Sequence, residues 1–358
     1  MRWVTAEDVD DLVLGSSVLG GGGGGDWYVP RQMLVAAIER FGPVPLVDAR
    51  ELDPQAQALP VISAGAPSAL IEMFHGQTES ARLRELVEQA AGRRCAAVLP
   101  VQPGPVNALV PLVAAAQLGL PCLDADVMLR CFPKVEMSLF SVAGISPSPV
   151  IAVDARGTSV VLSGPDNATV SQLLRSCMPQ LGLVAMVSAY QVTIGQCARL
   201  APAGGVTGCV RRGRGMRAAR DRLGPGAFAD PEYLAAIGGR LLFTGVVAEL
   251  LQRTSDGFPR GVLSIESASD PSQVLRVDFQ NENLVAARDG VVAATVPDLI
   301  NLVDADTGTV MQTVDLAVGQ RVHLVVSPVD ERWHTEPGIS MVGPRAFGYD
   351  IDPVRVAR

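Results

Sequence analysis

Alternating strand-like and helix-like segments constrain the fold of this chain more than any other feature. The run Cys95 to Val101 is continuously apolar, as expected of a parallel strand buried on both faces. Thr78 to Ala91 has the spacing of an amphipathic helix, and a small-residue helix ending at Gly119 precedes a strand over Pro121 to Leu123. Together with strands over Val44 to Val47 and Pro60 to Ala64, this order implies right-handed parallel crossovers. We therefore predict an α/β fold for the N-terminal part.

From Arg240 onwards the pattern changes, because strand-like runs dominate and Asp289-Gly290 and Thr307-Gly308 mark tight turns. The predicted strands cover 241–251, 261–266, 273–279, 284–287, 291–296, 310–314 and 321–326. We predict two domains that pack closely. Residues 1–166 form a mainly parallel α/β domain, and residues 167–358 form a β-rich domain that begins with a helical segment over 167–224.

Composition excludes several classes of protein. Hydrophobic residues make up 48% of the 358 residues and charged residues 18%, which indicates a globular chain. The net charge of −8 argues against a nucleic-acid partner. No apolar run reaches the roughly 18 residues of a membrane span, and the polar N-terminus does not resemble a signal peptide. The six cysteines form no Cys-x-x-Cys motif, and we predict that they are buried free thiols. We expect a cytoplasmic protein.

Six consecutive glycines, Gly20 to Gly25, separate a predicted helix over Thr5 to Leu14 from another over Arg31 to Phe41. Glycine-rich backbone before a helix can bring N–H groups close to a ligand. The spacing matches neither a P-loop nor a dinucleotide fingerprint. A flexible crossing between two helices is the alternative. We interpret the run as a loop that faces a ligand or makes a close backbone contact, with Gly21, Gly22, Gly23 and Gly24 as candidate substrate-binding residues.

Polar residues in three other segments are further site candidates. Asp124 and Asp126 follow an apolar strand, at the end where open α/β sheets bind ligands and metals. The alternative is that they cap a helix or pair with neighbouring charges. Arg130 can bind a substrate carboxylate as a bidentate fork, or pair with Glu136. Further candidate substrate-binding residues are Asn107 and the Asn281-Glu282-Asn283 segment, whose amides and carboxylate suit a ring amide but can also hold a turn.

Several of these segments together resemble one known family. They are Gly20 to Gly24, Asp124-Ala125-Asp126 with Arg130, Phe132 and Pro133, Phe279 to Leu284, Pro297 to Ile300, and Gly343 to Asp350. The chain resembles, over nearly its whole length, the family once catalogued as domain of unknown function 917 and now named for S-methyl thiohydantoin desulfurase.

The resemblance implies an α/β domain followed by a β-rich domain. It also implies hydrolysis of an S-methylated thiohydantoin ring, with release of methanethiol and formation of a hydantoin. Members of the family occur beside hydantoinase and oxoprolinase subunits, so such subunits are expected partners. This chain departs from the family pattern at Gln102, where a glutamate is usual, and at Val127 and Leu129, where glycines are usual.

Displacing a thiolate from an amidine-like carbon needs an activated water, which a divalent metal ion can supply. Asp124, Asp126 and His75 are the candidate metal ligands and catalytic residues, and this donor set suits zinc, manganese or iron. A loop position for His75 and a capping role for Asp126 are the alternatives. We thus predict a hydrolase of small cyclic amides or thioamides that forms a homo-oligomer. The competing hypothesis is a non-catalytic subunit that partners a hydantoinase- or oxoprolinase-like enzyme.

Overall fold

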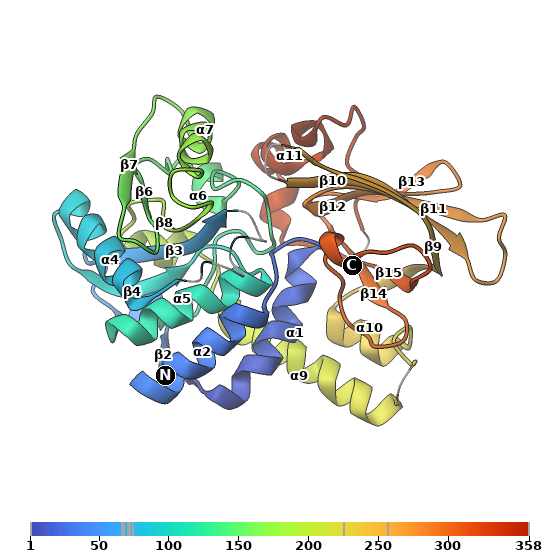
Figure 1. Cartoon of the computed structure of the whole chain (residues 1–358), viewed down its shortest axis with the longest axis horizontal. Helices are drawn as coiled ribbons and strands as arrows, with labels where there is room; N and C mark the ends of the chain where they lie inside the picture. The colour runs from blue at the N-terminus through green and yellow to red at the C-terminus, as the bar shows by residue number, and fades with distance from the viewer. Residues whose placement is uncertain are drawn as a thin grey trace. The chain divides into compact units, whose positions relative to one another are not determined.

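The computed structural model describes residues 2–65, 69, 73, 75–224, 226–255 and 258–356. The chain forms two compact units (Figure 1). Unit 1 comprises Met1–Val13, Gly25–Met128 and Lys134–Gly208, and unit 2 comprises Leu14–Gly24, Leu129–Pro133 and Cys209–Arg358. The units are therefore not two consecutive halves of the chain. Two short segments from the N-terminal part, which carry the glycine run and Arg130, belong to unit 2.

An eight-stranded sheet forms the centre of unit 1 in the described residues, with the order β1-β2-β5-β4-β3-β8-β6-β7. Its strands are β1 (Arg2–Val4), β2 (Val44–Val47), β3 (Gln57–Gly65), β4 (Cys95–Pro100), β5 (Cys122–Leu123), β6 (Val150–Val153), β7 (Ser159–Leu162) and β8 (Val184–Ser188). The neighbours β2, β5, β4 and β3 pair in parallel, and the other pairs are antiparallel. The sheet is thus parallel at its centre and antiparallel at both edges.

Helices and apolar strands bury the core of unit 1. The helices of this unit are α2 (Tyr28–Phe41), α4 (Gln77–Ala91), α5 (Pro105–Leu118), α6 (Leu139–Val142), α7 (Asn167–Cys177) and α8 (Ile194–Leu200). Helix α5 packs along β3 and β4 and against α2 and α4 (Figure 1). It begins with Pro105, whose missing N–H is not needed in the first turn, and it ends before Gly119 in the left-handed conformation. Its first eleven residues are all buried.

In the described part of unit 2, seven strands form a sheet of order β13-β12-β11-β10-β9-β15-β14 that is antiparallel throughout. Its strands are β9 (Arg240–Ser255), β10 (Phe258–Ser267), β11 (Val274–Gln280), β12 (Glu282–Arg288), β13 (Val291–Thr295), β14 (Leu299–Asp304) and β15 (Arg321–Ser327). The unit also contains α10 (Pro231–Ile237) and α11 (Glu336–Val342). The alternating burial along β11, in which every second residue faces the core, is the period-two pattern of a strand with one buried face.

The predicted fold class is confirmed, with an α/β part whose sheet is partly parallel and a β-rich part that is antiparallel. One predicted strand is wrong. Residues 310–314 contain only an isolated bridge at Val310, followed by a 3-10 helix over Thr313–Asp315, because Thr313 donates its N–H to the glycine run rather than to a strand. No helix among the described residues is long and apolar enough to cross a membrane.

Two helices cross with their backbones in direct contact inside unit 2. They are α1 (Val9–Gly20), which is longer than the predicted helix over residues 5–14, and α9 (Gly205–Leu223). A Cβ atom on Gly15 would lie 1.9 Å from the Cys209 carbonyl oxygen and 2.9 Å from the Gly213 nitrogen. Only glycine at position 15 permits this crossing, because backbone atoms cannot move aside as a flexible side chain can.

We expect Gly15→Ala to lower the free energy of unfolding by about 2–3 kcal/mol, because the added methyl group overpacks a backbone contact. Gly208→Ala is the matched control in α9, where a Cβ atom would meet nothing within 4 Å. The control should stabilise the protein by about 0.5–1 kcal/mol through helix propensity. Urea denaturation measures both changes, and equal stability of the two variants would contradict the close crossing.

Candidate functional site

The glycine run lies directly against three polar side chains of unit 2. A Cβ atom on Gly21 would lie 2.9 Å from Arg130 Nη2, one on Gly22 would lie 2.6 Å from Asn283 Nδ2, and one on Gly23 would lie 2.6 Å from Glu282 Oε1. Gly21 and Gly22 also have positive φ angles of 58° and 89°. Both the backbone conformation and the lack of space require glycine here. We call Gly21–Gly24, Arg130 and Asn281–Asn283 the glycine-loop site.

Main-chain hydrogen bonds fix the loop in this position. Gly21 O accepts the Asn283 N–H at 2.8 Å, and Gly22 O accepts the Thr313 N–H at 2.7 Å. Thr313 Oγ1 in turn donates to Asn281 O at 2.8 Å. Asn281 is the single residue between β11 and β12 and has a φ of 66°, a left-handed conformation that asparagine tolerates better than most residues. The tight turn and the polar side chains of Asn281, Glu282 and Asn283 are therefore combined in one segment.

Arg130 is completely buried and is held by carbonyl groups. Its Nη1 donates to Pro297 O at 2.6 Å and to Asp298 O at 2.9 Å, and its Nε donates to Cys131 O at 3.1 Å. Burial lowers the pKa of Arg130, while the charge of Glu282 acts in the opposite direction. Among the residues that the structure describes, only Nη2 of this side chain lacks a hydrogen-bond partner, so the expected bidentate binding of a carboxylate is not available. Arg130 can offer one charged donor.

Glu282 is the titratable group of this site. The side chain is buried, and burial raises the pKa of its carboxyl to about 7, although the Arg130 charge and the hydrogen bond from Asn281 Nδ2 lower it. That hydrogen bond to Glu282 Oε1 measures 2.8 Å. Glu282 Oε2 has no partner among the described residues. A carboxyl group with a pKa near neutrality can both accept and donate a proton at physiological pH.

Further buried polar atoms of unit 2 are without partners in the described residues. Asn283 donates through Nδ2 to Ile300 O at 2.9 Å, but its Oδ1 is unpartnered. Both amide atoms of Asn301 on β14 and Nε2 of Gln312 are unpartnered as well. Buried polar groups are usually hydrogen-bonded, so a set of open donors and acceptors distinguishes this part of unit 2. Thr313, Asn301 and Gln312 were not predicted, since no local motif distinguishes them.

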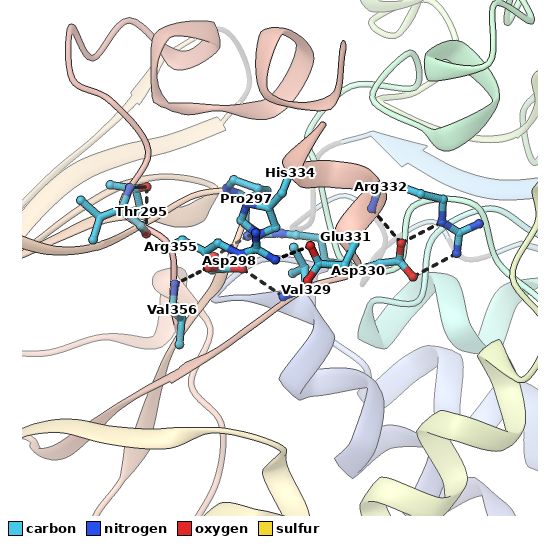
Figure 2. Close-up of polar contacts among 12 residues, drawn as sticks. Thr295, Pro297, Asp298, Val329, Asp330, Glu331, Arg332, His334, Arg355 and Val356 are labelled. Carbon is cyan, nitrogen blue, oxygen red and sulfur yellow. Dashed lines mark hydrogen bonds and ion pairs between the residues drawn. The ribbon is translucent and has the colours of Figure 1, made fainter. Parts of the chain in front are cut away.

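Asp298, whose carbonyl binds Arg130, ties the end of the chain to this region (Figure 2). Its Oδ1 accepts the Val329 N–H at 3.0 Å and lies 2.9 Å from His334 Nε2, and its Oδ2 accepts the Val356 N–H at 2.7 Å. The carboxylate is fully buried, so these contacts replace its hydration. Asp298 therefore has a structural role that holds the Arg130 carbonyl partners in place.

Asp124 and Asp126 lie in unit 1. Asp124 caps helix α9, and Asp126 accepts a hydrogen bond within a turn. Asp124 Oδ1 accepts the Thr207 N–H at 2.9 Å and Oδ2 accepts from Thr207 Oγ1 at 2.7 Å, so Asp124 caps the first turn of α9 from the end of β5. Asp126 Oδ1 accepts the Met128 N–H at 3.1 Å. Asp124 also lines a pocket of about 310 Å³ with Arg2, Asp48 and other residues.

His75 and Asn107 meet at a third residue, Ser63, in unit 1. His75 Nε2 lies 2.8 Å from Ser63 Oγ, and His75 Nδ1 lies 3.0 Å from Glu79 Oε1. Asn107 Oδ1 accepts the Ser63 N–H at 2.6 Å, and Asn107 Nδ2 donates to Ser63 O at 3.2 Å. Ser63 and Glu79 were not predicted. The four-residue spacing of His75 and Glu79 is the one sequence signal that could have indicated their contact.

The predicted site residues thus divide between two places. The glycine run, Arg130, Asn281, Glu282 and Asn283 come together in unit 2, whereas Asn107, His75, Asp124 and Asp126 lie in unit 1. The described residues, which include His75, Asp124 and Asp126, contain no group of three or more His, Cys, Asp or Glu that could hold a metal ion. The structure therefore does not bring the three expected ligands together. Metal binding itself stays a prediction.

The fold defines a two-domain protein, with an α/β part and a β-rich part that contains a buried polar cluster. Two family models match consecutive parts of the chain: the S-Me-THD-like N-terminal domain over residues 7–164 and the S-Me-THD-like C-terminal domain over residues 165–356. The chain belongs to the S-Me-THD-like family, which confirms the resemblance to S-methyl thiohydantoin desulfurase. The models meet at residues 164 and 165, and the boundary expected at residue 166 stays a prediction.

A solved structure has a similar fold. The chain is similar to a protein from Chromobacterium violaceum, whose crystal structure comes from a structural genomics consortium, with a TM-score of 0.81 and 22% sequence identity over 100% of both chains. At this level of identity the likeness shows the fold alone. No curated protein matches the chain.

Replacing Asp124 tests its capping role. We expect Asp124→Ala to lower the free energy of unfolding by about 1–2 kcal/mol, as loss of a helix cap does, without changing the metal content of the purified protein. The control Asp221→Ala alters an exposed carboxylate in the same helix and should change stability by less than about 0.5 kcal/mol. Loss of stoichiometric metal with unchanged stability in Asp124→Ala would restore the metal-ligand interpretation.

Glu282 should make stability depend on pH. The folded protein keeps this proton up to about pH 7, whereas the unfolded chain releases it near 4.5, so stability falls as the pH rises through this window. The total loss should be about 3 kcal/mol. Glu282→Gln, which stays neutral, should lack this loss. Chemical denaturation of both proteins between pH 4 and 8 measures the difference, and parallel pH profiles would contradict the raised pKa.

Proposed function

We propose that this protein hydrolyses a small five-membered cyclic amide or thioamide of the S-methyl thiohydantoin or hydantoin class at the glycine-loop site. Membership of the S-Me-THD-like family supports the substrate class. The observation that carries the proposal is the set of three buried atoms without partners in the described residues: Arg130 Nη2, Glu282 Oε2 and Asn283 Oδ1. They combine one charged donor with two acceptors.

A hydantoin-type ring presents the complementary pattern, because its N–H groups alternate with carbonyl groups. In the proposed complex, Arg130 Nη2 donates to a ring oxygen or to the nitrogen on which charge develops, and Asn283 Oδ1 accepts a ring N–H. A site that hydrogen-bonds a buried substrate discriminates strongly against analogues that lack the matching group.

Glu282 is the proposed general base and acid. In its ionised form the carboxylate accepts a proton from the attacking water as the new carbon–oxygen bond forms. The carbon–sulfur bond then breaks, and the departing thiolate takes the proton from Glu282 to give methanethiol. The second proton of the water, left on the new hydroxyl group, passes to the ring nitrogen, so that a ring carbonyl and a ring N–H are formed. Arg130 stabilises the negative charge that develops on the ring in between. No step in this scheme requires a metal ion, and metal participation stays open to direct measurement.

Turnover of an S-methylated thiohydantoin tests the proposal, with methanethiol followed by a thiol reagent and the hydantoin by mass spectrometry. Glu282→Gln should lower kcat about 10²–10⁴-fold, the usual effect of losing a general base. For the wild type, kcat/KM should rise as the pH passes about 7, since the base must be ionised. Asn283→Ala should act mainly by raising KM.

The control Glu249→Gln alters an exposed glutamate on β9 and should leave the rates unchanged. Metal content, measured on the same preparations, shows whether activity follows a bound ion. Wild-type protein that turns over neither thiohydantoins nor hydantoins would overturn the proposal and favour a non-catalytic subunit that acts with a hydantoinase- or oxoprolinase-like partner.

A further inference from the structure

Unit 1 contains an arrangement of side chains that the proposed function does not use. Ser63 Oγ, the imidazole of His75 and the carboxylate of Glu79 lie in a row, with Oγ 2.8 Å from Nε2 and Nδ1 3.0 Å from Oε1. This is the order of contacts in a nucleophile, base and orienting acid. We propose that Ser63 is a nucleophile activated by His75 and positioned by Glu79, and that this second site transfers small acyl groups from esters or thioesters to water.

The hydrogen bonds determine which nitrogen of His75 can act as the base. In the proposed arrangement Nδ1 donates to Glu79 Oε1, which leaves Nε2 to accept from Ser63 Oγ. The other carboxylate oxygen, Oε2, accepts the Gly76 N–H in front of α4 and thereby fixes the acid. Glu79 is a positioning residue, because it acts on the reaction through His75.

The position of Ser63 in the fold suits this role. Strand β3 pairs in parallel with β4 only as far as Val61, and Ser63 lies just beyond, opposite Met186 of β8. It is therefore at the carboxyl end of the parallel strands, where open α/β sheets bind their ligands. Ser63 is partly exposed, whereas His75 and Glu79 are 3% and 2% exposed. The nucleophile is accessible, and the residues behind it are shielded from water.

The main chain at Ser63 is held rigidly. Asn107 accepts the Ser63 N–H and donates to the Ser63 carbonyl, so one amide side chain binds both backbone groups. Asn107 Nδ2 also donates to Gln102 Oε1 at 2.9 Å. Groups held by such supporting contacts lose little freedom when they react, which is the requirement for an efficient nucleophile. Asn107, predicted from the sequence to bind substrate, is thus a positioning residue for Ser63.

The proposed acyl transfer at Ser63 needs no cofactor. Ser63 Oγ bonds to the acyl carbon and gives its proton to His75 Nε2. The alcohol or thiol leaves with that proton, and an acyl-serine remains. Water then gives a proton to Nε2 as its oxygen attacks the acyl carbon, and Ser63 Oγ departs with this proton. The net reaction consumes one water and yields an acid and an alcohol or thiol.

A small alkyl fluorophosphonate tests the proposal on the full chain, because it bonds to activated serine oxygens with loss of fluoride. We expect one adduct by intact mass, mapped to Ser63 by peptide mass spectrometry and absent from Ser63→Ala. The control Ser159→Ala removes another partly exposed strand serine of unit 1 and should label like the wild type. His75→Gln should slow labelling about 100-fold or more.

Two further measurements keep the test decisive. Glu79→Gln retains an acceptor for the Gly76 N–H but not the carboxylate, so labelling should slow while the thermal unfolding temperature stays close to that of the wild type. Wild-type protein without an adduct on Ser63, or equal labelling rates in His75→Gln, would overturn the proposal whether or not any variant is unstable. Labelling needs no thiohydantoin, so either result leaves the function proposed for the glycine-loop site untouched.

Discussion

The close approach of the glycine backbone to buried polar side chains is the constraint on which the site in unit 2 depends. Three consecutive glycines lie against Arg130, Asn283 and Glu282, at positions where a Cβ atom would not fit. Burying a charged group is costly unless it is hydrogen-bonded. Main-chain carbonyls accept from Nε and Nη1 of Arg130, and Nη2 has no partner among the described residues.

Much of the fold follows from the sequence because apolar periodicity is a local signal. The apolar run from Cys95 and the amphipathic helix before Gly92 are seen as β4 and α4 within one or two residues. The strand expected at residues 310–314 fails because its backbone bonds to a loop almost 300 residues earlier in the chain. The same long-range contacts place the glycine run and Arg130 in unit 2, which no local pattern can show.

The candidate site was predictable only in part. Glycine runs and clustered amides signal special backbone and polar chemistry, so the residues of the glycine-loop site could be proposed together. An aspartate after a strand has several uses, however, and Asp124 caps α9 through Thr207, 83 residues later. Ser63 has no local signal at all, since it is singled out only by its contacts with His75, which precedes α4, and with Asn107 of α5.

Leu129 shows how strongly the position of Arg130 is determined. Its φ angle of 63° is left-handed, a conformation that costs a branched or bulky residue about 1–2 kcal/mol. The chain nevertheless keeps the conformation, and the Cys131 N–H donates to Leu19 O at 2.8 Å next to it. Contacts on both sides of Arg130 therefore outweigh the local strain. A conformation maintained against such a cost shows that the surrounding contacts, and not the local preference of Leu129, determine where Arg130 lies.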